Sequence, residues 1–437
     1  MIYPSLVTRL KRAWAALTSE QQAEFDEPLN RAYEAALAFL DTRVPPTTEG
    51  FPPEMLLARI VLTDKVELLK KHAELSIRQA FFGLKPYIDK HGEIWGFGKY
   101  EQGDIYWIEA LAADWENIVE NKSFPFGEAA PEIVSYETDD FRLAIMGDWG
   151  TGEWGIKPSE CPSQKISCQI VKARPDITIH LGDVYYAGSS GEEAANLINM
   201  WPSVPDAWGS FTLNSNHEMY PGGVHYYKAL QNPLFARQKQ RSFFAVETNK
   251  WIILGLDSAF NSSARLYMDG ALWPAKTDPE DSPQFQLIRE VAKRGKRIIL
   301  LTHHNPLNYT GRIDSSTALL KKQVEEAFSG TNARPDYWYY GHIHIGAVYA
   351  PGVAGDSTQY RCVGHGGLPW GKASILEKNY PLRVSWFEQT PMPGSPNNRV
   401  ANGYAVLHCK GTTIDETIYN ENGALSWNSH TSVQRTA

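Results

Sequence analysis

Side chains that can bind metals gather at the ends of apolar runs in the middle of this chain. Asp148 and Asp183 each follow a glycine that ends such a run, in the segments IMGDWG and HLGDVYY. A carboxylate at the point where a buried strand becomes a loop is held firmly and can still reach solvent. One Gly-Asp pair alone could be an ordinary turn. Further along the chain lie Asn216-His217, His303-His304 and His342-x-His344. Together these residues predict a metal site assembled from several loops.

The residue types limit the metal chemistry. The candidate ligands combine carboxylates, imidazoles and an amide, and they are Asp148, Asp183, Asn216, His303, His342 and His344, with Tyr186 as a further candidate. Such a mixture suits first-row metals such as iron, zinc or manganese. These ligands are too many for one ion, but two ions that share a bridging carboxylate would use them all. Metal pairs about 3.5 to 4 Å apart stabilise the attacking and leaving oxygens of a displacement at phosphorus.

The motifs GDWG, GDVYY, SNHE, THH and GHIH, in this order, resemble those of the metallophosphoesterase (calcineurin-like) superfamily. The resemblance covers residues 141–346 and does not extend to residues 1–135. Tyr186, three residues after Asp183, makes the chain most similar to the purple acid phosphatase branch. The chain departs from the family where Ser215 replaces the usual glycine before Asn-His. Serine resists some backbone angles that glycine permits, but the ligand set stays complete.

The resemblance implies a binuclear centre in which iron is paired with iron, zinc or manganese. The implied ligands are Asp148, Tyr186 and His344 for the first ion, Asn216, His303 and His342 for the second, and Asp183 as the bridge. Motif position selects His303 over its neighbour His304, which would then point into the fold or line the pocket.

Three further residues are predicted to act in catalysis. By the resemblance, His217 is not a ligand but contacts the substrate phosphate or protonates the leaving oxygen. Glu218 would orient His217 through a hydrogen bond, as carboxylates behind a metal site do. His365 lies in the segment VGHGGL, where flexible glycines suit close approach to a ligand. It is therefore a candidate for the substrate pocket.

The implied activity is hydrolysis of a small phosphate ester, in which a metal-bound hydroxide attacks phosphorus in line. The prediction is a phosphomonoesterase. A phosphodiesterase acting on a cyclic nucleotide or a glycerophosphodiester has the same motifs and remains an alternative. A phosphatase-like binding scaffold without catalysis is the alternative from another class, although such proteins usually lose ligands that this chain keeps.

The composition excludes some classes of protein. The chain has 437 residues and a net charge of −8, so it lacks the concentrated positive charge of a general nucleic-acid surface. No stretch approaches the roughly 18 to 20 apolar residues of a membrane span. Four cysteines in a chain of this length suit reduced thiols and a cytoplasmic protein. A secreted mature form is an alternative, because a processed chain would also lack a signal sequence.

The elements that position the motifs predict two domains. Residues 1–135 are expected to be mostly helical, with amphipathic helices over 5–40, from Leu57 to Ile77 and over 104–120; Pro28 interrupts or restarts one of them. This part could serve as a lid, a dimer surface or a partner-binding unit. Residues 136–437 alternate strands and helices, and strands ending at Met146, Leu181, Leu301 and Tyr340 lead into the ligand motifs. This rhythm predicts an α/β fold with layered packing, and the resemblance implies a layered αββα metallophosphoesterase sandwich.

Overall fold

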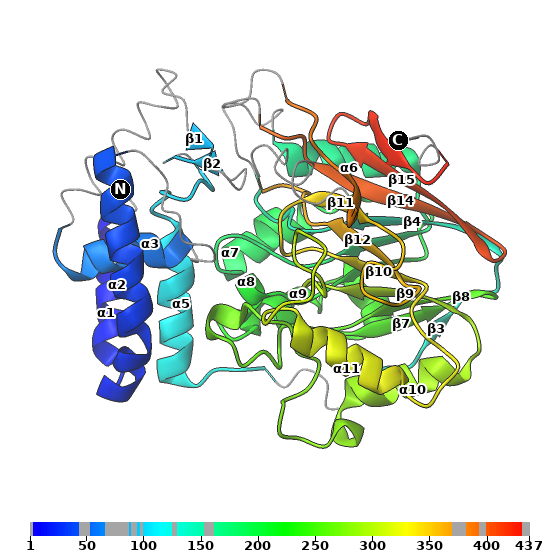
Figure 1. Ribbon diagram of the computed structural model, residues 1–437, viewed down its shortest axis with the longest axis horizontal. Helices are drawn as coiled ribbons and strands as arrows, with labels where there is room; N and C mark the ends of the chain where they lie inside the picture. The colour runs from blue at the N-terminus through cyan, green and yellow to red at the C-terminus, as the bar shows by residue number, and fades with distance from the viewer. Residues whose placement is uncertain are drawn as a thin grey trace.

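The computed structural model describes residues 3–42, 53–65, 87–88, 94–96, 99–124, 129–152, 161–368, 382–392 and 399–430. The first part of the chain is helical, and its elements are α1 (Tyr3–Ala16), α2 (Ser19–Thr42), α3 (Pro53–Leu62) and α5 (Trp107–Glu120), with the short strands β1 (Tyr87–Ile88) and β2 (Ile94–Trp95). Figure 1 shows these helices standing together beside the end of the sheets from which α7 and α8 emerge.

Apolar residues at helical spacing hold this helical segment together. Leu10, Phe25, Leu29 and Trp115 are among the residues buried in one cluster between α1, α2, α3 and α5. The structure corrects the expectation for Pro28, because α2 continues through it. Packing of the apolar face on both sides of the proline maintains the helix. The structure also corrects the predicted helix from Leu57 to Ile77, because α3 ends at Leu62 and Asp64 has a φ of 59°. The rest of that predicted helix lies beyond residue 65, outside the described residues.

Two large sheets form the rest of the described structure. The eight-stranded sheet has the order β13-β11-β12-β10-β9-β8-β7-β3 and the six-stranded sheet the order β16-β15-β14-β4-β5-β6. The strands of the first are β3 (Val134–Ser135), β7 (Phe244–Glu247), β8 (Trp251–Gly255), β9 (Arg297–Thr302), β10 (Tyr337–Tyr340), β11 (Gly346–Tyr349), β12 (Gln359–Val363) and β13 (Val384–Phe387). Those of the second are β4 (Asp140–Met146), β5 (Ile177–His180), β6 (Gly209–Thr212), β14 (Gly403–Lys410), β15 (Thr413–Asn420) and β16 (Leu425–Asn428).

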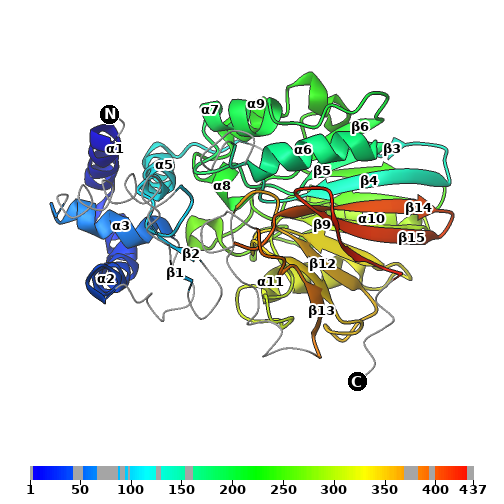
Figure 2. The same cartoon turned by 90° about the horizontal axis from the view of Figure 1, so that it is seen from above.

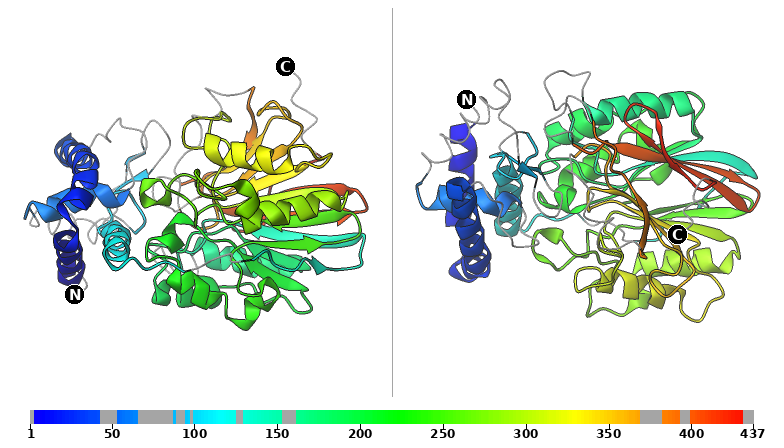
Figure 3. Two further views of the ribbon diagram at one scale, coloured as in Figure 1. Left: turned by 90° about the horizontal axis from the view of Figure 1, so that it is seen from below. Right: turned by 45° about the horizontal axis from the view of Figure 1, so that its top comes forward.

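Helices cover the outer faces of both sheets, as Figures 2 and 3 show. Side chains of α6 (Pro162–Ala173) and α9 (Val224–Ala229) pack against the six-stranded sheet. Those of α10 (Pro283–Lys293) and α11 (Ala318–Phe328) pack against the eight-stranded sheet. The remaining helical elements are α7 (Ser190–Glu192), a π-helix (Glu193–Ile198), α8 (Asn216–Met219) and short 3-10 turns at Pro233–Gln238, Arg265–Tyr267 and Pro279–Asp281.

The main core lies between the two sheets. Leu143, Ile145 and Ile179 of one sheet meet Ile253 and Ile299 of the other in a single buried cluster. Sheet-on-sheet packing with helices outside confirms the predicted α/β layered fold.

Parallel strands bring the motifs to one edge of this core. β4, β5 and β6 run parallel in one sheet, and β8, β9, β10 and β12 run parallel in the other. The carboxyl ends of parallel strands meet at the same edge, where α/β folds place their ligands. The loops that follow β4, β5, β6, β9 and β10 carry Asp148, Asp183, Asn216, His303 and His342. Among the described residues, no helix combines the length and the apolar character needed to cross a bilayer.

Candidate metal centre

The backbone at the predicted ligands adopts an uncommon conformation. Asp148, Asp183, His342 and His344 have φ values of 55°, 79°, 69° and 49°. Residues other than glycine rarely adopt positive φ, and each such residue costs free energy that the surrounding structure must offset. The strand ends therefore hold these side chains in fixed directions that relaxed loops would not give.

Gly182 lets the loops approach each other. Its φ is +104°, and a Cβ atom placed there would lie 2.8 Å from the Cβ of Ser215 and 2.9 Å from Nδ1 of His303. Ser215 itself has an extended backbone with φ −139°, which any residue adopts, so serine in place of glycine introduces no strain. Its hydroxyl accepts a hydrogen bond of 3.1 Å from the His217 backbone N–H and caps α8.

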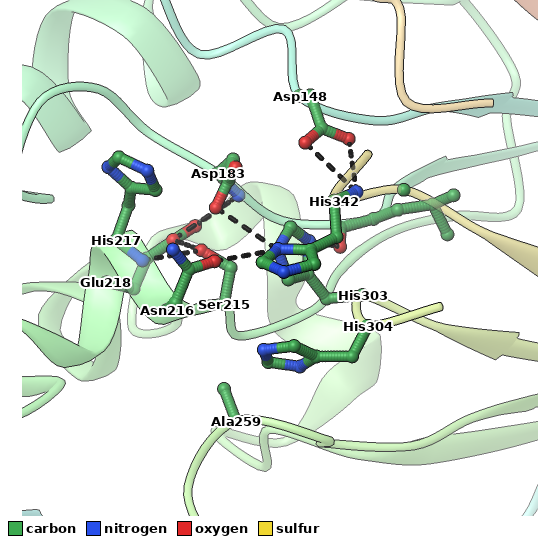
Figure 4. Close-up of polar contacts among 12 residues, drawn as sticks. Asp148, Asp183, Ser215, Asn216, His217, Glu218, Ala259, His303, His304 and His342 are labelled. Carbon is green, nitrogen blue, oxygen red and sulfur yellow. Dashed lines mark hydrogen bonds and ion pairs between the residues drawn. The ribbon is translucent and has the colours of Figure 1, made fainter. Parts of the chain in front are cut away.

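A first group of ligand atoms, which includes one oxygen of Asp183, lies around Nε2 of His303 (Figure 4). Nε2 of His303 lies 3.0 Å from Oδ1 of Asn216, 3.2 Å from Oδ1 of Asp183 and 3.2 Å from Nδ1 of His342. The four side chains come from four loops and are buried or nearly so.

Nε2 of His303 faces Oδ1 of Asn216 and Oδ1 of Asp183, and none of these three atoms carries a hydrogen. Nδ1 of His303 is 2.9 Å from the carbonyl of Leu181, so Nδ1 carries the hydrogen and Nε2 presents a lone pair. The Asn216 amide donates through Nδ2 to the Tyr220 hydroxyl over 3.1 Å, which leaves Oδ1 as an acceptor. Oδ1 of Asp183 is buried and has no hydrogen-bond donor among the described residues. Converging buried acceptors of this kind fit a metal cation.

A second group gathers around the other oxygen of Asp183. The Tyr185 hydroxyl donates to Oδ2 of Asp183 over 2.6 Å and lies 2.9 Å from Nε2 of His344. The same Nε2 is 3.5 Å from Oδ1 of Asp148 and 3.9 Å from Oδ2 of Asp183. The His342 backbone N–H, at 3.1 and 3.0 Å from the two oxygens of Asp148, fixes that carboxylate. Asp183 thus turns one oxygen to each group.

The structure does not bring Tyr186 to this cluster, contrary to its predicted place. Its hydroxyl donates to Asp104 and accepts a 3.2 Å hydrogen bond from the Tyr100 backbone N–H. Tyr185 faces Asp183 instead. Val184, between them, forms an isolated bridge with Gly150, and side chains on either side of an extended residue point to the same face. Alternation along the chain was the signal in the sequence that could have selected Tyr185.

His217 and Glu218 lie beside the cluster, but they do not pair as predicted. Nδ1 of His217 is 2.6 Å from the carbonyl of Tyr186. The Glu218 carboxylate accepts the Asp183 backbone N–H over 3.1 and 3.3 Å and the Ser215 hydroxyl. Successive residues of α8 point in different directions, so Glu218 faces the Asp183 loop. Glu218 therefore positions Asp183, and a main-chain carbonyl orients His217.

A ring nitrogen of His304 lies within 4.8 Å of ring nitrogens of His303 and His342, whereas His365 is not part of this group. Both ring nitrogens of His304 are engaged, at 2.9 Å from the Ser258 hydroxyl and 2.8 Å from the Tyr267 carbonyl, so this ring has no lone pair left for a metal. His365 is 3% exposed. It lines a cavity of about 10 Å³ behind His344, with room for about one water molecule. That cavity is too small for a substrate, and the role of His365 in a substrate pocket stays a prediction.

Burial sets the protonation of the ligands. Burial lowers the pKa of His303 to about 4 and holds that of His342 well below its usual value. Both rings are therefore neutral near pH 7. Burial, with the charge of Asp183 next to it, raises the pKa of Asp148. Burial alone would raise the pKa of Asp183, but His303 and the other surrounding histidines hold it well below its ordinary value. Of these two carboxylates, Asp183 therefore keeps its negative charge to lower pH.

The helical segment forms one wall of the site. The Trp107 ring lies 5.9 Å from Tyr185, 5.0 Å from Tyr186 and 5.9 Å from His217, centroid to centroid. Trp107 begins α5 and is 3% exposed. Trp107 lies far from the ligand motifs in the sequence, and no pattern in the sequence predicts that α5 packs against them.

Comparison with protein families supports the resemblance in the middle of the chain. Residues 141–346 match the family described as calcineurin-like phosphoesterase. No curated protein matches the chain.

Solved structures with a similar arrangement are distant in sequence. GAP50, the anchor in the inner membrane complex of Plasmodium, is 12% identical, with a TM-score of 0.46 over 67% of this chain and 88% of that one. A dimetal phosphatase from Danio rerio is 13% identical, with a TM-score of 0.39 over 64% and 96%. PhoD is 11% identical, with a TM-score of 0.44 over 68% and 73%.

Proposed function

We propose that this protein hydrolyses small phosphate monoesters with a pair of transition-metal ions. Residues 141–346 match the calcineurin-like phosphoesterase family, and that match supports metal-dependent hydrolysis of a phosphoester. One observation carries the proposal. The Asp183 carboxylate presents its two oxygens to two separate groups of ligand atoms, which is the arrangement that a bridging carboxylate requires.

The proposed ligands follow the two groups. The first ion would be held by Asp148, Tyr185 and His344, the second by Asn216, His303 and His342, and Asp183 would bridge them. Tyr185 replaces Tyr186 in this assignment. A phenolate beside an aspartate and a histidine supports a centre of the purple acid phosphatase kind, with iron in the first position and iron, zinc or manganese in the second.

The chain's own residues orient the reaction. When bound, the ions would neutralise the phosphate and lower the pKa of a water molecule from 15.7 toward about 7. The hydrogen bond from Nδ1 of His217 to the Tyr186 carbonyl leaves Nε2 as the nitrogen that would protonate the leaving oxygen. Because burial lowers the pKa of this ring, Nε2 carries that proton only at acidic pH. The Glu218 carboxylate accepts a hydrogen bond from the Asp183 backbone N–H and so fixes the loop that carries Asp183. Trp107 packs against the rings of Tyr185 and His217 and excludes water from that side.

We also propose that residues 1–135 form a domain of their own that encloses one side of this site. Its helices have a shared apolar cluster, which also includes Ala187 and Tyr220 from the loops around the site. A wall of this kind restricts the size of substrate, which favours a small monoester over a bulky diester.

The test compares hydrolysis of p-nitrophenyl phosphate and its bis-ester after removal of metal with a chelator and reloading with iron, zinc or manganese. We expect the monoester activity to disappear with the metal and return on reloading. His217→Asn should keep the metal and lose most turnover, while His408→Asn, at a surface pair with Asp140, should change neither. Faster hydrolysis of the bis-ester would establish a phosphodiesterase. Fully loaded protein that hydrolyses neither compound would contradict the proposal.

A further inference from the structure

We propose that Glu54, in the helical segment, is a positioning residue for the metal site, and that it acts on the ligand Asn216 through Tyr220. This inference rests on the proposed function, because it concerns the affinity of the second ion. A buried chain of hydrogen bonds joins the three side chains. The Asn216 amide donates to the Tyr220 hydroxyl over 3.1 Å, and that hydroxyl donates to Oε1 of Glu54 over 3.0 Å.

All three residues are shielded from water. Glu54 is 2% exposed, Tyr220 1% and Asn216 2%. Buried polar groups depend on their partners in the protein, so each bond in the chain constrains the next. Glu54 lies in the first turn of α3 and is separated from Tyr220 by 166 positions in the sequence. The contact therefore ties the helical segment to the loop that follows β6.

The direction of the hydrogen bonds decides which end of the Asn216 amide faces the metal. An amide has a donor end and an acceptor end of nearly the same shape, and a rotation of 180° exchanges them. In the structure Oδ1 faces Nε2 of His303 at 3.0 Å. Because Nε2 of His303 presents a lone pair, the reversed amide would donate a hydrogen bond to it. Before metal binding, that reversed orientation would satisfy His303 and remove the oxygen ligand.

Glu54 disfavours the reversed orientation. Since Glu54 accepts the hydrogen of Tyr220, the Tyr220 oxygen is left with lone pairs only and must receive a donor. Nδ2 of Asn216 supplies that donor. In a reversed amide, Oδ1 would face the Tyr220 oxygen, and two buried acceptors would be in contact without a hydrogen. That arrangement carries the cost of unsatisfied buried polar groups. The acceptor on α3 thus keeps Oδ1 of Asn216 turned toward the cation.

The test measures metal affinity by competition with a chelator in the full-length protein. Glu54→Leu should weaken binding of one of the two ions by about 10- to 100-fold, the range found when groups that orient metal ligands are removed. Glu54→Gln should restore most of the affinity, because the amide oxygen of glutamine can still accept from Tyr220. A purely structural role would not separate these two variants.

Further variants test whether Glu54 acts on Asn216 through the Tyr220 hydroxyl. Tyr220→Phe should weaken the same ion, and Glu54→Leu in the Tyr220→Phe background should add little, because Glu54 acts only through that hydroxyl. Asp114→Leu is the matched control, since Asp114 is a buried acid in the same helical segment, 3% exposed. It should leave both affinities unchanged.

Wild-type protein that binds two ions, with Glu54→Leu binding both equally well, would overturn the inference and leave the proposed function intact. Equal weakening by Asp114→Leu would also overturn it. Wild-type protein that binds no transition metal would refute the proposed function and this inference together.

Discussion

Replacing Tyr185 and Tyr186 separately with phenylalanine tests which tyrosine binds the first of the two proposed metal ions. The Tyr185 hydroxyl is 2.6 Å from Oδ2 of Asp183 and 2.9 Å from Nε2 of His344. The Tyr186 hydroxyl belongs to a different contact, with Asp104. Phenylalanine keeps either ring and its packing against Trp107, so each change removes one hydroxyl only.

The magnitudes follow from these contacts. A hydrogen bond to a charged group contributes roughly 1.5 to 3 kcal/mol, and each 1.4 kcal/mol is about tenfold in affinity. Tyr185→Phe removes the hydrogen bond to Asp183 together with a proposed ligand, so it should weaken binding of the first ion by at least about 10- to 100-fold. Asp104 is 5% exposed, and it keeps donors from the Tyr100 and Tyr106 backbone N–H groups. Tyr186→Phe should therefore lower the free energy of unfolding by about 1.5 to 3 kcal/mol and leave the metal in place.

The assay is the visible spectrum of the iron-loaded protein, with metal content measured on the same sample. A phenolate bound to Fe(III) gives a charge-transfer band. We expect Tyr185→Phe to lose that band and Tyr186→Phe to retain it. A band that survives in Tyr185→Phe and disappears in Tyr186→Phe would refute the assignment.

Three other perturbations have outcomes that the structure fixes. Burial raises the pKa of Asp114 to about 7, so its contribution to stability is complete below about pH 4 and is lost by about pH 7. The melting temperature of Asp114→Asn should therefore fall less than that of the wild type as pH rises through this range. Parallel melts of wild type and variant from pH 4 to 8 check this, and equal slopes would contradict it. Gly182→Ala should cost about 1 to 3 kcal/mol of stability and weaken metal binding, because of its positive φ and the contact with Ser215; unchanged denaturation and metal titrations would oppose this. The Arg361 guanidinium donates to the two oxygens of buried Glu416 over 2.7 and 2.9 Å. Arg361→Met leaves Glu416 without this charged partner and should lower the free energy of unfolding, measured with urea, by about 3 to 5 kcal/mol. Adding Glu416→Leu should recover most of the loss.

Local patterns in the sequence were enough to predict the layered fold. The strands that end at Met146, His180, Thr302 and Tyr340 are apolar runs that stop at polar residues, and such boundaries depend on neighbours in the chain. Pro28 was the exception. The tertiary packing of α2 against α1 and α3 decides that helix, and a local breaker signal does not include that packing.

In the candidate site, too, the sequence predicts the residues that lie in short motifs, but it does not decide between the two neighbouring tyrosines. The structure brings together Asp148, Asp183, Asn216, His303, His342 and His344, which all lie in short motifs at strand ends. Tyr185 and Tyr186 differ only in the direction of their side chains. Alternation along an extended segment places Tyr185 on the same face as Asp183, but the bridge between Val184 and Gly150 that makes this segment extended is visible only in the structure.

Glu54 shows the limit of reasoning from the sequence alone. It lies outside the region that resembles the family, and its connection to Asn216 is made only when α3 packs against α8 through Tyr220. The helical spacing of Asn216 and Tyr220, four residues apart, could have suggested their contact. Nothing in the sequence links either of them to residue 54.

The central claim is that Asp183 bridges two metal ions, and metal stoichiometry tests it most directly. Wild-type protein purified after growth with iron, zinc and manganese should contain two transition-metal ions per chain. Asp183→Asn should lose at least one ion and nearly all hydrolysis of p-nitrophenyl phosphate, because the neutral amide offers one oxygen where the carboxylate offers two. Asp183→Asn protein with two ions and full activity would contradict the account.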